Sequence, residues 1–122
     1  RALGPVKGHD IAVPLAAIPA FVAEADTATA RLDPAAQPLV FGHLGDGNLH
    51  YVVQTSRADL VSPEIHAIAA RHGGTIAAEH GVGVEKKPYI TLVRSEGELS
   101  ALRRLKAAFD PDRILNRGRI LD

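Results

Sequence analysis

The chain of 122 residues contains no cysteine, no methionine and no tryptophan. Without cysteine, neither a disulfide framework nor a thiolate metal site can form, so a bound metal must use imidazole and carboxylate ligands. The 14 basic and 14 acidic residues balance, which excludes the basic excess typical of nucleic-acid binders. No apolar run approaches the roughly 20 residues of a membrane span, and no signal-peptide pattern opens the chain. We therefore expect one globular domain, and the first residue, Arg1 rather than Met, suggests a processed chain or a piece of a longer one.

Hydrophobic periodicity and turn residues predict four strands and three helices. The strands are expected at 9–15, 37–44, 48–55 and 74–81, and the helices at 19–32, 63–72 and 96–109. Ser62 precedes Pro63 as the expected N-cap of the second helix, and Ser95 with Glu98 predicts a capping box for the third. The order β-α-β-β-α-β with an added C-terminal helix predicts an α+β, ferredoxin-like split βαβ fold, in which helices cover one face of an antiparallel sheet.

The segment GHLGDGNLH (42–50) places two histidines around a glycine-rich turn. Asp46-Gly47 is a favoured pair for a two-residue hairpin loop, which would set His43 directly opposite His50 on one face. Two imidazoles at that spacing can bind one divalent cation. The register would also turn Leu44 and Leu49 into the core. The alternative is a surface histidine pair without a metal, because two ligands do not make a site.

Glu79 and His80 lie at the end of the fourth expected strand and offer a third ligand and a general base. The alternative for this pair is an exposed strand end. Of the other histidines, we expect His9 to be structural, His66 to be solvated, and His72 to complement the dipole at the end of its helix. The segment GVGVEKKPY (81–89) lacks the third glycine of a dinucleotide fingerprint and the ending of a P-loop, so no nucleotide-binding signature is present.

Four segments together resemble the C-terminal domain of FAD-linked oxidases, the family of D-lactate, glycolate and D-2-hydroxyglutarate dehydrogenases. They are HDIAVPLAAIPAF, GHLGDGNLH, EHGVGVEKKPY and FDPDRILNRGRIL, in that order along nearly the whole chain. The resemblance implies that residues 1–122 form a ferredoxin-like cap and substrate domain. It also implies a separate N-terminal FAD-binding domain that is absent from this chain, so the chain alone should be inactive.

The resemblance also implies roles for individual residues. It assigns a divalent metal, Zn or Mn, to His43, His50 and Glu79, and the active-site base to His80. It further points to Asn116 for cofactor binding and to Lys7, Asn48 and Lys86 for substrate binding. Under this hypothesis the metal chelates the carboxylate and hydroxyl of a 2-hydroxy acid, His80 accepts the hydroxyl proton, and a hydride passes to FAD.

Three positions depart from the family pattern. Gly8 stands where members show Lys, so that Lys7 is displaced by one residue, and Val52 stands where several hydroxyglutarate-type members have Asn. Asn116-Arg117-Gly118-Arg119 replaces the closing Asn-Pro-Gly-Lys. The sequence thus favours the cap domain of a D-2-hydroxy acid dehydrogenase of cytoplasmic location, peripheral to a membrane only through an electron acceptor, with a homodimer as one candidate assembly. The alternatives are a stand-alone ferredoxin-like metal or small-ligand module and a non-catalytic oligomerisation domain.

Overall fold

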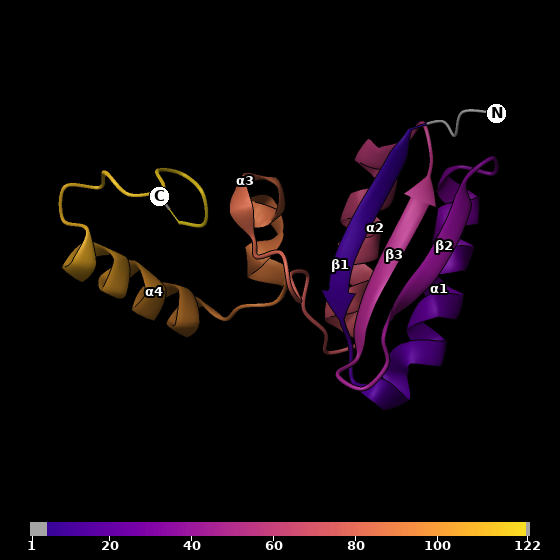
Figure 1. Ribbon diagram of the computed structural model, residues 1–122, viewed down its shortest axis with the longest axis horizontal. Helices are drawn as coiled ribbons and strands as arrows, with labels where there is room; N and C mark the ends of the chain where they lie inside the picture. The colour runs from indigo at the N-terminus through magenta and orange to yellow at the C-terminus, as the bar shows by residue number, and fades with distance from the viewer. Residues whose placement is uncertain (1–4, 122) are drawn as a thin grey trace.

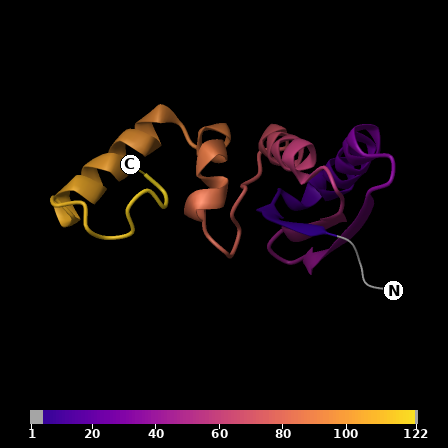
Figure 2. The same cartoon turned by 90° about the horizontal axis from the view of Figure 1, so that it is seen from above.

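The computed structural model describes residues 5–121 (Figure 1). The elements in chain order are β1 (Val6–Ala12), η1 (Leu15–Ala17), α1 (Ile18–Leu32), β2 (Gln37–His43), β3 (Asn48–Gln54), α2 (Ala58–Arg71), α3 (Gly83–Lys86), η2 (Lys87–Leu92) and α4 (Glu96–Phe109). The three strands form one antiparallel sheet in the order β1-β3-β2. Helices α1 and α2 both lie on one face of it (Figure 2), so the expected α+β class is confirmed.

Strand alternation divides β3 between a buried face and an open face. Leu49, Tyr51 and Val53 are buried and point toward α1 and α2, where they pack with Phe21 and Ile65. The alternate residues of β3 point to the other face. We call this the open face, because no long helix within residues 5–121 covers it. The core therefore lies between the sheet and the two helices, and polar side chains on the open face remain available for chemistry.

The expected fourth strand at 74–81 is wrong. Only Thr75 pairs with the sheet, through an isolated antiparallel bridge to Ala12 on the outer edge of β1. Beyond that bridge the backbone N–H groups of Glu79 and His80 donate to the Asp10 side chain rather than to a neighbouring strand. These N–H groups therefore bind the Asp10 carboxylate instead of the carbonyl oxygens of a neighbouring strand, so the strand does not continue.

The second helix begins at Ala58, five residues before the expected start at Pro63, so Pro63 lies inside it. Ser62 is therefore not an N-cap. Its hydroxyl lies 2.9 Å from the His9 Nε2 atom in the core. The longer helix buries Val61 completely, a gain in apolar burial that offsets the backbone hydrogen bond lost at Pro63.

The C-terminal helix α4 begins as expected. The Ser95 hydroxyl accepts from the Glu98 N–H, and the Glu98 carboxylate accepts from the Ser95 N–H, which completes the predicted capping box. After α4, the Asp110 carboxylate accepts from the N–H groups of Ile114 and Leu115 and so turns the chain back. This C-terminal arm, residues 95–121, lies away from the sheet in both ribbon views (Figures 1 and 2). Between residues 5 and 121, no helix has the length and apolar character needed to cross a membrane.

Candidate metal centre

The hairpin between β2 and β3 carries the two histidines of the GHLGDGNLH segment. Its loop comprises residues 44–47, so His43 pairs with Asn48 and His50 pairs with Phe41. The expected direct pairing of His43 with His50 is wrong, because the loop has four residues rather than two. A register shift of two residues nevertheless leaves every side chain on its face. His43 and His50 therefore remain diagonal neighbours on the open face, with ring centroids 5.9 Å apart.

The same shift separates the two leucines that were expected in the core. Leu49 is buried as predicted, whereas Leu44 lies in the loop and is 70% exposed. The loop is held by Asp46, whose carboxylate accepts from the Asn48 N–H at 3.1 Å, and by Gly47, whose carbonyl accepts from the Val13 N–H at 3.2 Å. These contacts attach the hairpin loop to the end of β1.

Glu79 joins the two histidines from the segment that follows the Thr75 bridge. Its Oε1 atom lies 3.5 Å from His43 Nε2, and its Oε2 atom lies 3.9 Å from His50 Nε2. One ligand atom from each residue lies within 4.8 Å of the other two. Atoms bound to one ion at about 2.0–2.2 Å lie at most about 4.4 Å apart. The His43 side chain is 62% exposed, so packing does not hold its ring at the present distance from the other two donors.

Asp10 holds Glu79 and His80 in place from β1. Its Oδ2 atom accepts from both backbone N–H groups at 2.9 Å, and Lys86 Nζ lies 3.6 Å from the same oxygen. Burial raises the pKa of the Asp10 carboxyl, but the two N–H donors and Lys86 outweigh it and leave the pKa below its usual range. The buried carboxylate thus fixes the direction in which the chain crosses the open face.

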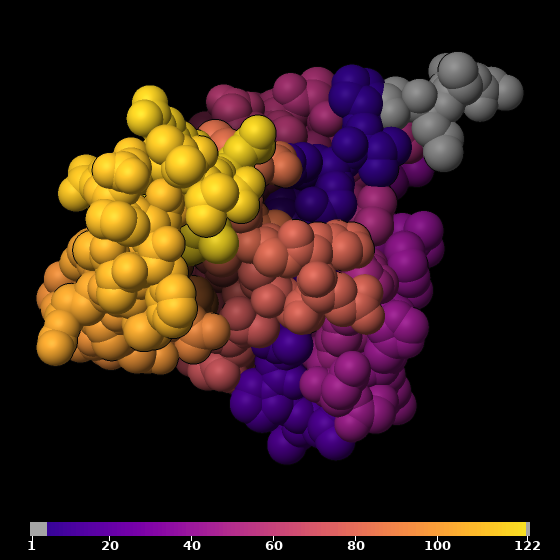
Figure 3. All heavy atoms as spheres, turned by 60° about the vertical axis from the view of Figure 1, so that its left-hand side comes forward, coloured from indigo at the N-terminus to yellow at the C-terminus, as the bar shows by residue number. Residues whose placement is uncertain are grey.

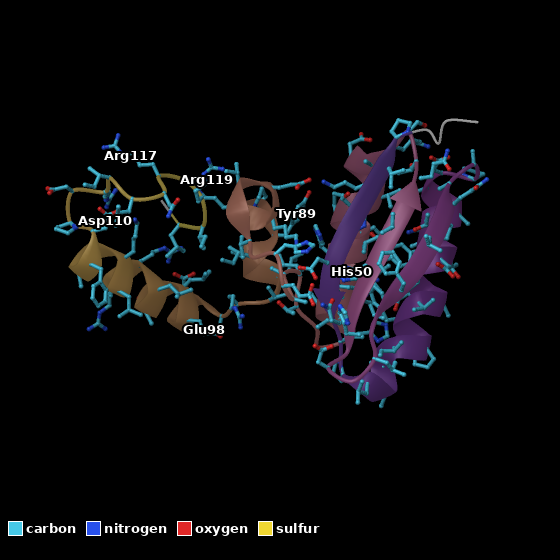
Figure 4. The ribbon with its side chains drawn as sticks, in the orientation of Figure 1. His50, Tyr89, Glu98, Asp110, Arg117 and Arg119 are labelled. Carbon is cyan, nitrogen blue, oxygen red and sulfur yellow. The ribbon has the colours of Figure 1, made fainter. Side chains whose placement is uncertain are left out.

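His80 lies beside the three donors at the rim of a cavity of about 570 Å³. Its ring stacks on that of His50 with centroids 5.9 Å apart, and its Nδ1 atom lies 3.9 Å from Asp10 Oδ2. Phe41 and Val52 line the sheet side of the cavity, and residues 80–86 line the opposite side. The space-filling view shows the segment between α2 and α4 lying over β1 (Figure 3). Figure 4 marks His50 on the sheet.

Comparison with known proteins identifies the family to which this geometry belongs. A family model described as FAD linked oxidases, C-terminal domain, matches residues 3–120. The chain is a member of that family. The FAD-linked oxidase C-terminal domain described here is 37% identical to a D-2-hydroxyglutarate dehydrogenase of Xanthomonas citri pv. viticola, over 93% of the chain and 26% of the relative. It is 43% identical to glycolate oxidase subunit GlcD of Bacillus subtilis, over 66% of the chain and 19% of that protein.

A third relative, the mitochondrial D-2-hydroxyglutarate dehydrogenase of Bos taurus, is 36% identical over 97% of the chain and 22% of its own length. The chain therefore spans about a quarter of the length of the relatives it matches.

The donor set of this FAD-linked oxidase C-terminal domain fits a divalent transition metal. Two imidazole nitrogens and one carboxylate oxygen are the ligands of many catalytic zinc sites, which keep a further coordination position open. Asn48 supports the fit, because its side chain is buried beside His43 with neither its oxygen nor its nitrogen paired among the described residues. A buried amide without partners is unfavourable, and a ligand with polar atoms at the site would supply them.

The domain does not bring every residue expected to bind substrate or cofactor to the donor set. Lys86 does reach the cavity, where its Nζ atom lies 3.3 Å from the Asp10 carbonyl and burial lowers its pKa. Lys7 points to the other side of β1, forms an ion pair with Glu85 and lines a separate hollow of about 260 Å³. Asn116 lies in the C-terminal arm, in a turn closed by its carbonyl and the Arg119 N–H.

The remaining histidines are structural, and His66 differs from the prediction. His9 is buried between the Tyr51 carbonyl and Ser62, and His72 contacts the Glu24 carboxylate at 2.8 Å, so neither is free for a ligand. His66 is not solvated as expected. It is 4% exposed and its ring lies 4.5 Å from that of Tyr89, which extends from η2 toward the sheet (Figure 4).

Sequence reasoning missed the role of Asp10. A signal was present, since His9 and Asp10 are adjacent polar residues inside a short apolar strand pattern, and adjacent strand residues point to opposite faces. One of the two had to be buried among α-helices and the other had to meet the open face. A buried polar side chain almost always has a hydrogen-bond partner. Both residues therefore required partners elsewhere in the chain.

Proposed function

We propose that this chain is the substrate- and metal-binding cap domain of an FAD-dependent 2-hydroxy acid dehydrogenase, with a substrate of D configuration. The observation that carries the proposal is the convergence of His43, His50 and Glu79 at the edge of a cavity that also receives His80. Several relatives are D-2-hydroxyglutarate dehydrogenases, which supports the proposal.

Each residue of the site has a distinct task. A divalent ion, Zn or Mn, would supply Lewis acidity toward the substrate carboxylate and 2-hydroxyl, and FAD would supply the hydride acceptor. His43, His50 and Glu79 hold the ion and thereby orient the substrate. His80 accepts the proton of the 2-hydroxyl on a ring nitrogen as general base.

Asp10, Lys86 and Asn48 support these tasks. Asp10 is a positioning residue, because its carboxylate binds the backbone N–H groups of the ligand Glu79 and the base His80. Lys86 neutralises the buried Asp10 charge from the cavity side. The unpaired amide of Asn48 is available to polar groups bound beside His43.

The FAD-binding domain of the same protein is the proposed partner. The C-terminal arm exposes large apolar side chains, of which Phe109 is 83%, Ile114 69% and Leu115 56% exposed. Exposed apolar surface of this extent marks an interaction site. Placing Asn116 at that interface would bring it to the cofactor, as the family resemblance implies.

The test is made in the full-length enzyme loaded with FAD and metal. Glu79→Gln keeps the side-chain shape but weakens a charged ligand, so metal content should fall and added metal should partly restore flavin reduction. His80→Ala should retain the metal and slow flavin reduction by about 10²–10⁴-fold, the usual contribution of a general base. Elemental analysis and stopped-flow absorbance measure the two effects.

His72→Ala is the matched control, because His72 lies at the end of α2 in contact with Glu24. It should change neither metal content nor the rate of flavin reduction. Flavin reduction at the wild-type rate in His80→Ala would remove His80 from the mechanism. Bound metal without flavin reduction by any 2-hydroxy acid would instead support the stand-alone metal-binding module.

A further inference from the structure

The cavity beside the metal donors has one apolar wall on the sheet. Phe41 pairs with His50, and Val52 follows His50 by two residues on the same strand, so all three side chains share the open face. Phe41 is 54% exposed and its ring lies 5.2 Å from that of His50. Val82 and Val84 line the cavity from the opposite segment. A substrate bound through its carboxylate and 2-hydroxyl at the metal would extend its remaining carbons along this wall.

The charged side chains around the cavity already form ion pairs with protein groups. Lys86 is the one lysine or arginine among the described residues that line it, and it contacts the Asp10 carboxylate. The neighbouring Glu85 is ion-paired with Lys7, which lies on the other side of β1. A second substrate carboxylate placed against Phe41 and Val52 would therefore be desolvated beside apolar groups and near an acidic side chain. Burial of an unpaired charge is strongly unfavourable.

We infer that the enzyme is specific for 2-hydroxy acids with an apolar side chain, and that Val52 is a specificity-determining residue. This inference rests on the proposed function and narrows its substrate class. The inferred substrate also differs from the one in the names of several relatives, because hydroxyglutarate is a dicarboxylate. The apolar wall gains from burying methyl and methylene groups, whereas the side chains of Phe41, Val52, Val82 and Val84 offer no hydrogen-bond donor to a terminal carboxylate.

Two ligand pairs of five carbons test the inference in the full-length, FAD-loaded enzyme. 2-Hydroxypentanoate and 2-hydroxyglutarate differ in a terminal methyl group against a carboxylate, as do the corresponding 2-oxo acids. The dissociation constants of 2-oxopentanoate and 2-oxoglutarate, measured by titration calorimetry, report binding without turnover. We expect 2-oxopentanoate to bind at least about tenfold more tightly, and flavin reduction by the D-hydroxy acids to show the same order.

Val52→Lys places a cation on the apolar wall and should shift the ratio of the two constants toward 2-oxoglutarate by at least about tenfold. Leu39→Lys is the matched control. Leu39 is the cross-strand partner of Val52 on the same open face, but it does not line the cavity. It should leave the ratio unchanged.

The possible outcomes distinguish failure of the apolar specificity from failure of the proposed dehydrogenase function. Tighter binding of 2-oxoglutarate to the wild type, or equal shifts in the two lysine variants, would overturn the apolar specificity and leave the dehydrogenase proposal standing. Binding of neither oxo acid, with no flavin reduction by either hydroxy acid, would overturn both.

Discussion

At the scale of single residues, the two buried histidines of the core differ in how their nitrogens are paired. His9 donates from Nδ1 to the Tyr51 carbonyl, and its Nε2 accepts from the Ser62 hydroxyl. His66 packs against the His9 ring at 5.5 Å, yet neither of its nitrogens has a hydrogen-bond partner among the described residues. Burial lowers the pKa of each to about 4. Both are therefore neutral in the folded chain near pH 7.

Stability should consequently fall as the pH drops from about 6.5 toward 4. In that window the unfolded chain takes up protons at His9 and His66 that the folded chain does not bind, so unfolding becomes more favourable. Each group contributes a slope of up to about 1.4 kcal/mol per pH unit. Above pH 6.5 the contribution of these histidines is constant.

Replacing His66→Phe should remove one of the two slopes. The variant loses no hydrogen bond, so we expect it to match the wild type near pH 7.5 and to exceed it by roughly 1–2 kcal/mol at pH 5. Urea unfolding of the chain at both pH values measures this difference. His9→Phe is the control, since it breaks two hydrogen bonds and should destabilise the fold even at pH 7.5. Identical pH dependence in His66→Phe and the wild type would contradict the burial of a neutral His66.

At the scale of elements, the hairpin loop decides where His43 lies. Gly47 has a φ of +74°, and a Cβ atom there would meet the Val13 carbonyl oxygen at 2.2 Å. That carbonyl belongs to the chain just after β1, so the loop packs directly against the strand that carries Asp10. The turn thus holds the end of β2, and with it the candidate donor His43, beside β1.

Gly47→Ala should destabilise this element strongly. The positive φ alone costs about 1–2 kcal/mol for an alanine, and the contact with Val13 adds to it, so we expect a loss of at least about 2 kcal/mol. Gly45→Ala is the matched control in the same loop, because a Cβ atom there meets nothing within 4 Å. It should change stability by less than about 0.5 kcal/mol. Thermal unfolding of the two variants makes the comparison, and equal losses would show that the loop is not constrained at Gly47.

At the scale of the whole molecule, the chain divides into a packed body, made of the sheet with α1 and α2, and an exposed C-terminal arm. The body buries its apolar side chains between the sheet and α1 and α2, whereas α4 buries only Leu99. The capping box stabilises the start of α4 locally, but the exposed side chains of Phe109 and Ile114 have no partner within the described chain that covers them. The arm is therefore suited to packing against a further domain.

The chain by itself should not retain FAD. Under the proposed function a separate domain binds the flavin, and this chain spans only about a quarter of the length of its relatives. After incubation with FAD and gel filtration, we expect a colourless protein. The full-length enzyme treated in the same way serves as the control and should elute with a flavin absorbance band. A yellow isolated chain would show that the domain binds the cofactor without its partner.

Local chemistry in the sequence determined most elements of this protein. The apolar period of 3.6 residues predicted α1 with its buried Phe21 and Ala25, and the Ser95 and Glu98 pair predicted the start of α4. These features depend on residues within one or two turns of one another, so their energetics can be read from adjacent positions. The shared face of His43 and His50 was predictable for the related reason that side chains alternate strictly along a strand.

Contacts between distant residues decided the rest. The Asp10 carboxylate captured two N–H groups about 70 positions later and ended the fourth strand after a single bridge. His66 is buried, and the Tyr89 ring packs against it. Lys7 points away from the cavity because it pairs with Val53, whose side chain lies on the core face of the sheet. No local sequence pattern encodes which of several N–H groups will donate to a buried carboxylate, or which segment will pack over a ring such as that of His66. Those outcomes depend on desolvation and packing across the assembled fold, which exist only once the tertiary structure has formed.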